Sequence, residues 1–383
     1  MTSLLSCSYA SVCAGCDWLM KPDAEQRQAK IENFEAHWRG TFPSGPALPE
    51  PKWITIEKGG LRDRVDLMID RRSGSPKLGL FDRFHTGIVD LQGCPQMSPA
   101  LEAWLQDFRK VQVPVERGSV RLRVAPNGTR GVWLDLANVD VKTLLDERKT
   151  LDALRSMAVV EIGQKRKRLV ERDGQLKLAD PILEPWFETY LETADGKEQA
   201  ASLYCAIGSF TQPGFRANRA LVREAREHLR QSQARTVAEF GSGIGNFTIP
   251  LASVAEKIHA YEVDTLALEG LKRTLDERGL NDRIEIHSGN FQVERKVPVD
   301  FAGVDLVFVD PPRSGLMKFL DPLEAMPPEQ RPKHFVYVSC FAESFTQDSA
   351  RLFALGYTLE RISLVDQFPQ SRHYETVASY VRK

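Results

Sequence analysis

The sequence predicts an α/β protein with a doubly wound, mainly parallel sheet in its C-terminal half, preceded by an antiparallel β-rich region. After residue 199, apolar strands alternate with amphipathic helices, and a glycine-rich loop follows the first of these strands. Before it, residues 53–193 contain short alternating strands separated by turn signals. We therefore expect a segment 1–50 with a cysteine cluster and a helix, a β-rich α+β domain over 51–200, and an α/β domain over 201–383.

Composition and charge place the chain among ordinary globular proteins. Of its 383 residues, 42% are apolar and 27% are charged, which excludes intrinsic disorder. The net charge is −1, so contact with a nucleic acid has to come from local basic patches. No run approaches the ~18 apolar residues of a membrane span. The N-terminus also lacks the basic and apolar regions of a secretory signal, so we expect a cytoplasmic protein without a membrane partner.

Four of the six cysteines form a candidate metal site. In the reducing cytosol, cysteines are not expected to form disulfides. The spacing of Cys7, Cys13 and Cys16, followed by distant Cys94, is near the iron–sulfur pattern C-x4-C-x2-C…C. Tetrahedral zinc also accepts four thiolates, so spacing alone leaves both metals open. Cys205 has no partner pattern, and we expect it in the core.

The β-rich region begins after a helix over 24–38 and a proline-rich loop. Asn127-Gly128 and Asp173-Gly174 are hairpin signals between alternating segments. A helix over 141–154 interrupts the strands. The expected strands are 64–70, 78–81, 87–91, 120–124, 131–136, 168–170 and 176–178.

The second half of the sequence alternates between expected strands and expected helices. Such alternation is typical of a parallel sheet covered by helices on both faces. The expected helices are 220–231, one beginning at 246, and 265–278, and the expected strands are 236–239, 257–262, 284–287, 304–309, 334–339 and 376–381.

A glycine-rich loop follows the strand 236–239. In Glu239-Phe-Gly-Ser-Gly-Ile-Gly245-Asn246, the glycines Gly241, Gly243 and Gly245 run G-x-G-x-G, unlike the dinucleotide fingerprint G-x-G-x-x-G. The pattern is typical of methyltransferase loops that bind S-adenosylmethionine. Glu262 ends the next strand, where a carboxylate can accept both ribose hydroxyls. A nicotinamide dehydrogenase and a purely structural turn are the alternatives.

A second motif, Asp310-Pro-Pro-Arg313, follows the strand 304–309 at the ligand-binding edge of the sheet. Amino-methyltransferases carry a similar motif with an aromatic residue after the prolines. Arg313 stands there instead, which predicts methylation at carbon. The alternative is a loop that the prolines merely stiffen.

Cys340 ends the strand 334–339 and is the candidate nucleophile. Glu375 and His373 lie two residues apart where the last strand begins. A thiolate that adds to C6 of uracil makes C5 nucleophilic, and a base must then remove the C5 proton. Glu375 is the expected base, and His373 is the alternative because it titrates near neutrality. A buried structural cysteine is the alternative for Cys340.

Together these motifs resemble the RNA uracil-5-methyltransferases. They occur in family order over about 175 residues: Phe210-Thr-Gln212, 239–247, Glu262, Asp310 to Arg313, Val338-Ser-Cys340, and Phe368-Pro369 to Glu375. The resemblance implies a Rossmann-like class I methyltransferase domain with S-adenosylmethionine as donor. It implies Cys340 as nucleophile and Glu375 as base. The implied donor-binding residues are Gln212, Phe240, Gly241, Gly243, Gly245, Asn246, Glu262 and Asp310.

The resemblance also bears on the metal and the RNA. The ribosomal branch of this family carries a [4Fe-4S] cluster, which implies Cys7, Cys13, Cys16 and Cys94 as its ligands. Because the cysteine cluster begins at Cys7, we expect no N-terminal barrel domain. The chain thus resembles the short 23S rRNA enzymes more than the tRNA enzymes, and no obligate protein partner is implied.

Two departures from the family pattern leave alternatives open. Phe341-Ala342 replace the usual Asn-Pro after the nucleophile, and the Asn that usually follows Gln212 closely is delayed to Asn218. The alternatives are the same chemistry on tRNA and a catalytically idle, RNA-binding iron–sulfur protein. The candidate RNA contacts are Arg62, Arg117, Arg121, Arg123, Arg130 and the run Lys165-Arg-Lys-Arg168, for which a solvated charged strand is the alternative.

Overall fold

The computed structural model describes residues 5–72, 75–113, 116–135, 141–163, 166–289 and 301–382. Residue 136 of an expected strand and Lys165 of the basic run lie outside the described residues. The chain forms two compact units. The first comprises Met1–Pro22, Glu57–Phe187 and Cys205–Arg216, and the second Asp23–Ile56, Glu188–Tyr204 and Ala217–Lys383. This grouping differs from the expected one, because the N-terminal helix belongs to the α/β unit and residues 205–216 belong to the β-rich unit.

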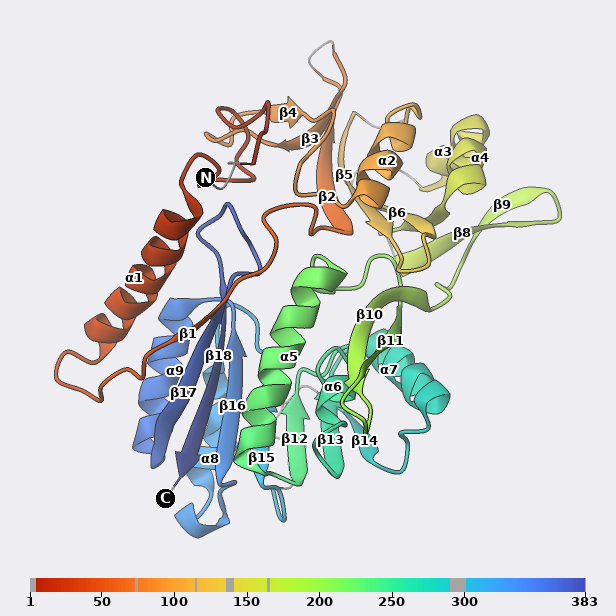
Figure 1. The fold of residues 1–383 in the computed structure, drawn as a ribbon. Coiled ribbons are helices and arrows are strands. Elements are labelled where there is room, and N and C mark those ends of the chain that lie inside the picture. The colour runs from red at the N-terminus through yellow and green to blue at the C-terminus, as the bar shows by residue number, and fades with distance from the viewer. Residues whose placement is uncertain are drawn as a thin grey trace. The chain divides into compact units, whose positions relative to one another are not determined.

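The first unit is built on one sheet with the strand order β4-β3-β2-β5-β6-β7-β8-β9 (Figure 1). The pairs are antiparallel except β6 with β7, which is parallel. The expected wholly antiparallel sheet is therefore wrong at this pair. A parallel pair needs a crossover connection, and α3 (Val141–Asp146) and α4 (Arg148–Met157) lie within the β6–β7 connection. The strands are β2 (Arg64–Asp70), β3 (Lys77–Phe81), β4 (Ile88–Asp90), β5 (Arg117–Val124), β6 (Arg130–Asp135), β7 (Val159–Ile162), β8 (Lys167–Arg172) and β9 (Gln175–Ala179).

Helix α2 (Pro99–Phe108) packs against β5 in the core of this unit. Ser98 caps the N-terminus of this helix, because its hydroxyl accepts a hydrogen bond from the Leu101 N–H at 3.3 Å. Leu101, Trp104 and Leu105 are fully buried. They cover the alternate apolar positions of the strands, which is the pattern expected of a sheet with one buried face.

The second unit contains a sheet with the order β1-β17-β18-β16-β15-β12-β13-β14. β18 is antiparallel to both of its neighbours, and the other pairs are parallel. The predicted doubly wound sheet is thus confirmed, with one antiparallel strand inserted. The strands are β1 (Lys52–Ile54), β12 (Thr236–Phe240), β13 (Lys257–Glu262), β14 (Ile284–Ser288), β15 (Leu306–Val309), β16 (His334–Ser339), β17 (Tyr357–Val365) and β18 (Glu375–Arg382).

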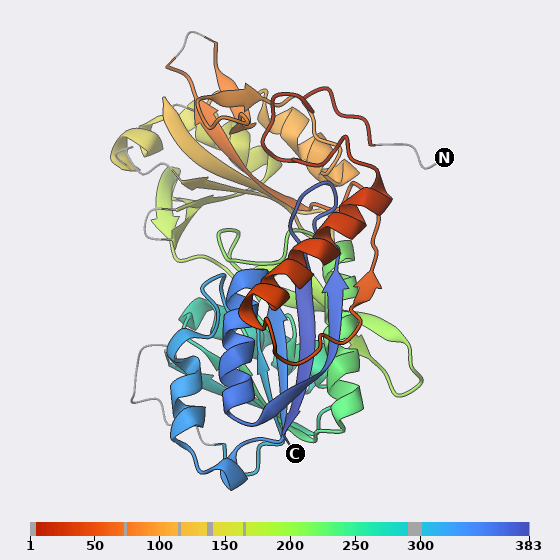
Figure 2. The same ribbon diagram turned by 90° about the vertical axis from the view of Figure 1, so that its left-hand side faces the viewer.

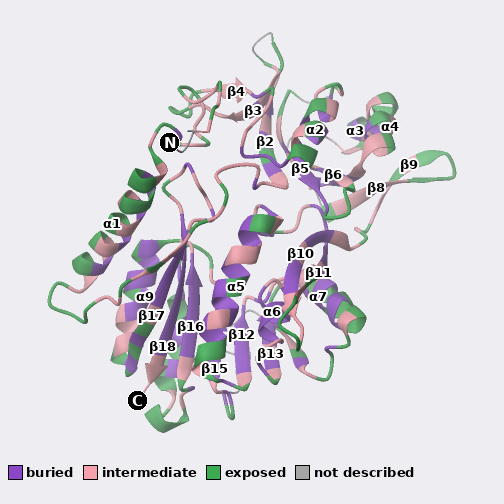
Figure 3. Cartoon of the chain, viewed as in Figure 1, coloured by how far each residue is buried: buried purple, intermediate pink, exposed green. Residues whose placement is uncertain are grey.

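Helices cover this sheet, and its central strands are buried (Figure 3). Helix α1 (Asp23–Thr41) lies beside α9 (Ala342–Ala354), where the rings of Phe34 and Phe345 are 5.6 Å apart (Figure 2). The other helices are α5 (Phe215–Ser232), α6 (Thr248–Leu251), α7 (Thr265–Arg278), α8 (Asp321–Ala325) and the 3-10 turns Met317–Leu320 and Pro328–Gln330, and β10 (Glu184–Glu192) pairs with β11 (Glu198–Cys205).

Candidate functional site at the carboxyl edge of the sheet

The parallel strands of the second unit end at a common edge. Phe240 of β12 is in register with Tyr261 of β13 and with Val309 of β15, and Val309 is in register with Tyr337 of β16. The residues that follow these positions are the glycine loop, Glu262, Asp310 and Cys340. The sheet therefore gathers the predicted donor and nucleophile motifs at the edge where ligands bind in such folds.

The glycine loop turns sharply at this edge. Gly241, Gly243 and Gly245 have positive φ angles of 79°, 54° and 96°, which disfavour other residues. A Cβ on Gly245 would lie 2.7 Å from Leu271, and one on Gly241 would lie 3.3 Å from the Asp310 carbonyl oxygen. A Cβ on Gly243 would meet nothing within 4 Å. The first and last glycines thus allow close packing, whereas the middle one borders open space.

Glu262 binds the loop through its carboxylate. Oε2 accepts a hydrogen bond from the Gly243 N–H at 3.0 Å, and Oε1 accepts from Val263 at 2.7 Å and Asp264 at 2.9 Å. A carboxylate offers about four acceptor positions. A ligand hydroxyl can therefore take the remaining position or displace the Gly243 N–H, which makes this carboxylate a suitable acceptor beside the loop.

Two of the predicted donor contacts have side chains that are engaged within the fold. The Asn246 and Asn218 amides exchange hydrogen bonds of 2.8 and 3.0 Å, and Thr189 Oγ1 donates to the Asn246 carbonyl at 2.8 Å. Phe240 is buried and stacks on Tyr261 at 4.5 Å. These side chains stabilise the strand and loop, so a donor would meet them through their backbone. The delayed Asn218 has this structural partner.

Gln212 lies in the first unit, in a loop that accepts hydrogen bonds from arginine side chains. Arg123 donates to Thr211 Oγ1 at 2.6 Å, and Arg64 donates to the Thr211 carbonyl at 2.9 Å. Arg123 is 1% exposed, and Arg121 donates to Asp66 at 2.6 Å and to the Gly208 carbonyl at 2.7 Å. The prediction that Arg121 and Arg123 contact phosphate is therefore wrong, because both guanidinium groups donate their hydrogen bonds to partners within the protein.

The candidate nucleophile and the candidate base lie opposite each other at the ends of two adjacent strands. In the antiparallel pair β16–β18, Ser339 is in register with Thr376. Extending this register by one residue places Cys340 opposite Glu375. Glu375 is 4% exposed and Cys340 is half-buried. His373 precedes β18 rather than lying on it, so its alternation with Glu375 on one strand face does not hold.

Burial and nearby negative charge raise the pKa of both groups in this pair. Burial raises the pKa of the Cys340 thiol to about 11, assisted by the charges of Glu375 and Asp310, whereas Arg313 lowers it through its charge and a hydrogen bond. Burial also raises the pKa of Glu375 well above its ordinary value. It raises the pKa of Asp310 to about 7. Such shifted groups in one place are typical of functional sites.

Asp310 connects the two halves of the edge. Its charge raises the pKa of Cys340 and Glu375 on one side. On the other side, it contributes to the raised pKa of Glu239, which burial brings to about 8 and to which Glu262 also contributes. The glycine loop and the thiol–carboxyl pair therefore lie within electrostatic range of one shared carboxyl group.

The four cysteines of the candidate metal site all belong to the first unit. Cys7 and Cys94 line the same pocket of about 530 Å³, and Cys13 Sγ accepts a hydrogen bond from the Gly15 N–H at 3.3 Å. Among the described residues, no three of the four sulfurs lie within 4.8 Å of one another. They do not form a cage closed around a single metal ion. Cys205 is buried, as predicted.

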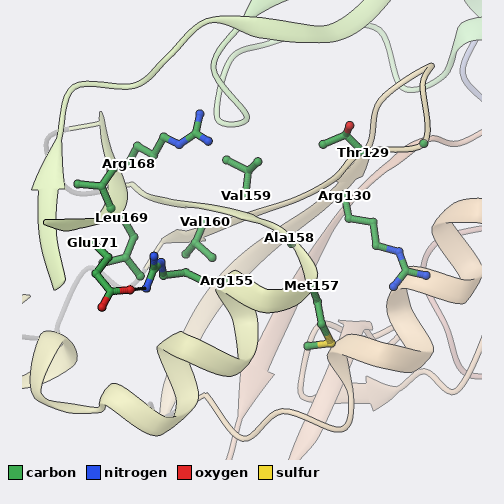
Figure 4. Close-up of a pocket in the computed structure, with 12 residues that line it drawn as sticks. Thr129, Arg130, Arg155, Met157, Ala158, Val159, Val160, Arg168, Leu169 and Glu171 are labelled. Carbon is green, nitrogen blue, oxygen red and sulfur yellow. Dashed lines mark hydrogen bonds and ion pairs between the residues drawn. The ribbon is translucent and has the colours of Figure 1, made fainter. Parts of the chain in front are cut away.

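A second pocket, of about 570 Å³, lies within the first unit and is lined by three arginines (Figure 4). Arg130 pairs with Asp107 at 2.7 Å, and Arg168 pairs with Glu184 at 3.0 Å. Arg155 pairs with Glu171 at 3.0 Å. Each cation already has a carboxylate partner, so a phosphate group would have to compete for it.

A strand-end thiol, a buried carboxyl group and a glycine loop with an acidic partner thus meet at one edge of an α/β sheet, the usual place for the active site of such a fold. The family model described as tRNA (Uracil-5-)-methyltransferase matches residues 188–383. An RNA methyltransferase of Bdellovibrio bacteriovorus is 42% identical over 384 residues, covering 98% of this chain and 95% of that protein. The chain belongs to the RNA uracil-5-methyltransferase family, and it is an RNA (uracil-C5)-methyltransferase.

Two further similarities extend over nearly the whole chain. A 23S rRNA (uracil(1939)-C(5))-methyltransferase of Shewanella sp. strain W3-18-1 is 24% identical over 390 residues, covering 98% of this chain and 81% of that protein. The tRNA (uracil-54, C5)-methyltransferase of Pyrococcus abyssi, solved with S-adenosyl-L-homocysteine, has a TM-score of 0.69 at 20% identity and covers 96% of this chain and 86% of its own. The latter shares the fold. In the described part of the chain, no helix is both long and apolar enough to cross a membrane.

Proposed function

We propose that the protein transfers a methyl group from S-adenosylmethionine to C5 of a uridine in 23S rRNA. The observation that carries this proposal is the placement of Cys340 opposite Glu375 at the edge that also holds the glycine loop and Glu262. The ribosomal target is supported by the similarity of the whole chain to the Shewanella enzyme. The family model and the Pyrococcus structure are named for tRNA, which makes tRNA the second candidate.

The proposed mechanism assigns one task to each residue. S-adenosylmethionine, when bound, offers an electrophilic methyl group. The Cys340 thiolate forms a bond to C6 of uracil, which makes C5 the nucleophile that takes the methyl group, while the bond between that group and the donor's sulfonium sulfur breaks to leave a neutral thioether. Glu375 then accepts the C5 proton, the bond from sulfur to C6 breaks, and the thiolate is restored. Arg313 supports the thiolate, because its charge and hydrogen bond favour the ionised sulfur.

The target is tested by mapping 5-methyluridine in cells that lack the protein. If 23S rRNA is the substrate, one uridine of that RNA loses its methyl group while the tRNA remains fully modified. Restoring the wild-type gene should return the modification, and restoring a Cys340→Ala version should not. Loss from tRNA alone would move the assignment to tRNA. Unchanged modification in both RNAs would favour the catalytically idle alternative.

The proposed ribose contact predicts weaker donor binding in Glu262→Ala. Two ribose hydroxyls lose a charged acceptor, and such a hydrogen bond contributes ~1.5–3 kcal/mol, which corresponds to roughly 10- to 150-fold in affinity. Calorimetry with S-adenosylmethionine measures the change. Glu360→Ala, which removes an exposed glutamate near the start of β17, is the matched control for donor binding. Equal affinity of Glu262→Ala and wild type would show that the ribose lies elsewhere.

The raised pKa values predict that methyl transfer accelerates as pH rises. The thiol and the carboxyl group react only after losing a proton, and both have raised pKa values, so their active forms increase as the pH rises toward the Cys340 pKa of about 11. Arg313→Ala should be slower at neutral pH and shift the rise to higher pH. The matched control is Lys318→Ala, an exposed cation shortly after the same motif. Single-turnover rates across pH test this, and a flat profile would contradict it.

We also propose that Cys7, Cys13, Cys16 and Cys94 hold a [4Fe-4S] cluster. Four thiols are the donor set that such a cluster requires, and two of them border one pocket. Sulfurs spaced too widely for one ion suit a multi-iron cluster better than zinc, whose four ligands lie closer together.

Cys94→Ser should remove this cluster. We expect the anaerobically purified wild type to be brown with about four irons, and the variant to be colourless and less stable, because metal binding is coupled to folding. Iron analysis and the visible spectrum provide the measurement, and Cys205→Ser is the control cysteine outside the set. A colourless wild type containing one stoichiometric zinc would replace the iron assignment while keeping the four ligands.

A further inference from the structure

A cluster of two histidines and one glutamate lies on the second unit's sheet, apart from the cysteines. His259 is on β13, and Glu285 and His287 are on the edge strand β14. His259 is in register with Glu285, and His287 is two residues further along β14, so all three side chains share one face. Among the described residues, it is the group whose potential metal-binding atoms all lie within 4.8 Å of one another.

The distances within this cluster are those of a coordination shell. His259 Nδ1 is 3.2 Å from His287 Nε2. Glu285 Oε2 is 3.5 Å from His259 Nδ1, and Glu285 Oε1 is 3.7 Å from His287 Nε2. With zinc–nitrogen bonds of ~2.0–2.1 Å, two ligand atoms of a tetrahedron lie ~3.3–3.4 Å apart. The separations of 3.2 and 3.5 Å lie on either side of this value, and the separation of 3.7 Å is slightly longer. One small ion can therefore bridge the three side chains with little movement.

The chemistry of the three groups matches the same ion. Two neutral imidazoles and one carboxylate form a common ligand set for zinc, with a fourth position open to water. The histidines are 26% and 28% exposed and the glutamate is 51% exposed, so an ion can enter from solvent. Without an ion, the two ring nitrogens can form one hydrogen bond between them, which is the simplest competing explanation.

One nearby cation opposes metal binding. Lys257 Nζ lies 3.5 Å from Glu285 Oε2 on the same pair of strands. Its charge neutralises part of the carboxylate's attraction for an ion. A true metal site should therefore bind more tightly when this lysine loses its charge, whereas a pair of hydrogen-bonded histidines should not respond in that way.

The cluster also adjoins the loop that the proposed donor uses. The His287 ring stacks on Tyr261 at 4.5 Å, and the Tyr261 carbonyl accepts hydrogen bonds from Gly241 and Ser242 at 2.9 and 3.1 Å. An ion that joins β14 to β13 would hold His287 against this residue. We propose that His259, Glu285 and His287 form a site for a divalent transition-metal ion, best suited to Zn²⁺, that fastens the edge strand of the sheet.

The test is a zinc titration of the chelator-treated full chain, with a chromophoric indicator as competitor. We expect His287→Ala to bind one equivalent of zinc fewer than wild type. The control His37→Ala, which removes a histidine on α1, should bind as much zinc as wild type. Glu285→Gln should bind at least tenfold more weakly. Lys257→Gln should bind several-fold more tightly. Equal stoichiometry in wild type and His287→Ala would overturn the proposal.

Cobalt distinguishes this site from the cysteines. Co²⁺ at a nitrogen and oxygen site gives visible bands without the sulfur charge-transfer absorption that thiolate ligands produce. We expect wild type to show such a sulfur-free component and His287→Ala to lack it. Thermal melting adds a check on folding, because Zn²⁺ should raise the melting temperature of wild type by more than that of His287→Ala, which keeps only the cysteines as ligands. Cobalt spectra with only the thiolate component in both proteins would overturn the proposal.

Discussion

Replacing the thiol in Cys340→Ala is expected to abolish methyl transfer. Cys340 is the one cysteine of the second unit, so without its thiol C5 is not made nucleophilic. Loss of a nucleophile that acts as part of a unit lowers turnover by on the order of 10⁴-fold or more. Transfer of labelled methyl groups into RNA measures the loss, and the same variant should form no covalent complex with RNA.

The variant also has internal controls for folding. Cys340 is half-buried and follows the last paired residue of β16, so we expect the pairing of β16 with β18 to persist in the variant. We therefore expect an unchanged far-ultraviolet circular dichroism spectrum and donor affinity close to that of wild type. Ser339→Ala, which alters a neighbour whose hydroxyl hydrogen-bonds the Phe341 backbone, should retain activity. Full activity in Cys340→Ala would exclude the covalent mechanism.

The second large effect is expected in Glu375→Gln. The amide keeps the size of the side chain but cannot accept a proton. Attack by Cys340 and methylation can proceed, while removal of the C5 proton and release of the thiolate stall. We therefore expect a methylated, covalently linked protein–RNA species that survives denaturing electrophoresis, together with a fall in turnover of about 10²- to 10⁴-fold, the range for loss of a general base.

His373 provides the competing assignment for this step. It lies just before β18, and its ring is 6.3 Å from that of Phe368. If His373→Ala traps the adduct while Glu375→Gln turns over normally, the base is His373. Mass spectrometry of the trapped species decides whether the methyl group has already been transferred. An adduct without the methyl group in Glu375→Gln would place its defect before proton removal.

Much of the fold could be predicted because local sequence signals and sheet topology agree. Parallel strands expose their carboxyl ends at one edge, so the motifs after β12, β13, β15 and β16 had to meet there. The strand β17 and the helix α9 were missed, although the alternating apolar residues of Tyr357–Val365 are a usable strand signal. The antiparallel insertion of β18 depends on long-range pairing, which local patterns do not encode.

The candidate site could likewise be predicted only in part from the sequence. Glu262 and the glycines follow from a loop whose geometry requires those residue types. The roles of Asn246 and Arg123 could not be predicted, because each depends on a partner distant in sequence: Asn218 for the first and Thr211 for the second. Charge on a strand does not reveal whether a guanidinium group faces solvent or the interior. The histidine and glutamate cluster was missed because its ligands come from two strands whose register only the fold determines.

The central claim is that methylation occurs at C5 of uracil with loss of the C5 proton to the protein. The most direct measurement uses RNA whose uracils carry tritium at C5 and a donor whose methyl group carries carbon-14. We predict that wild type releases one tritium to water for each methyl group transferred, and that Glu375→Gln transfers methyl groups without proportionate tritium release. Methylation by wild type without any tritium release would contradict the account, because the methyl group would then lie on a nitrogen or oxygen atom.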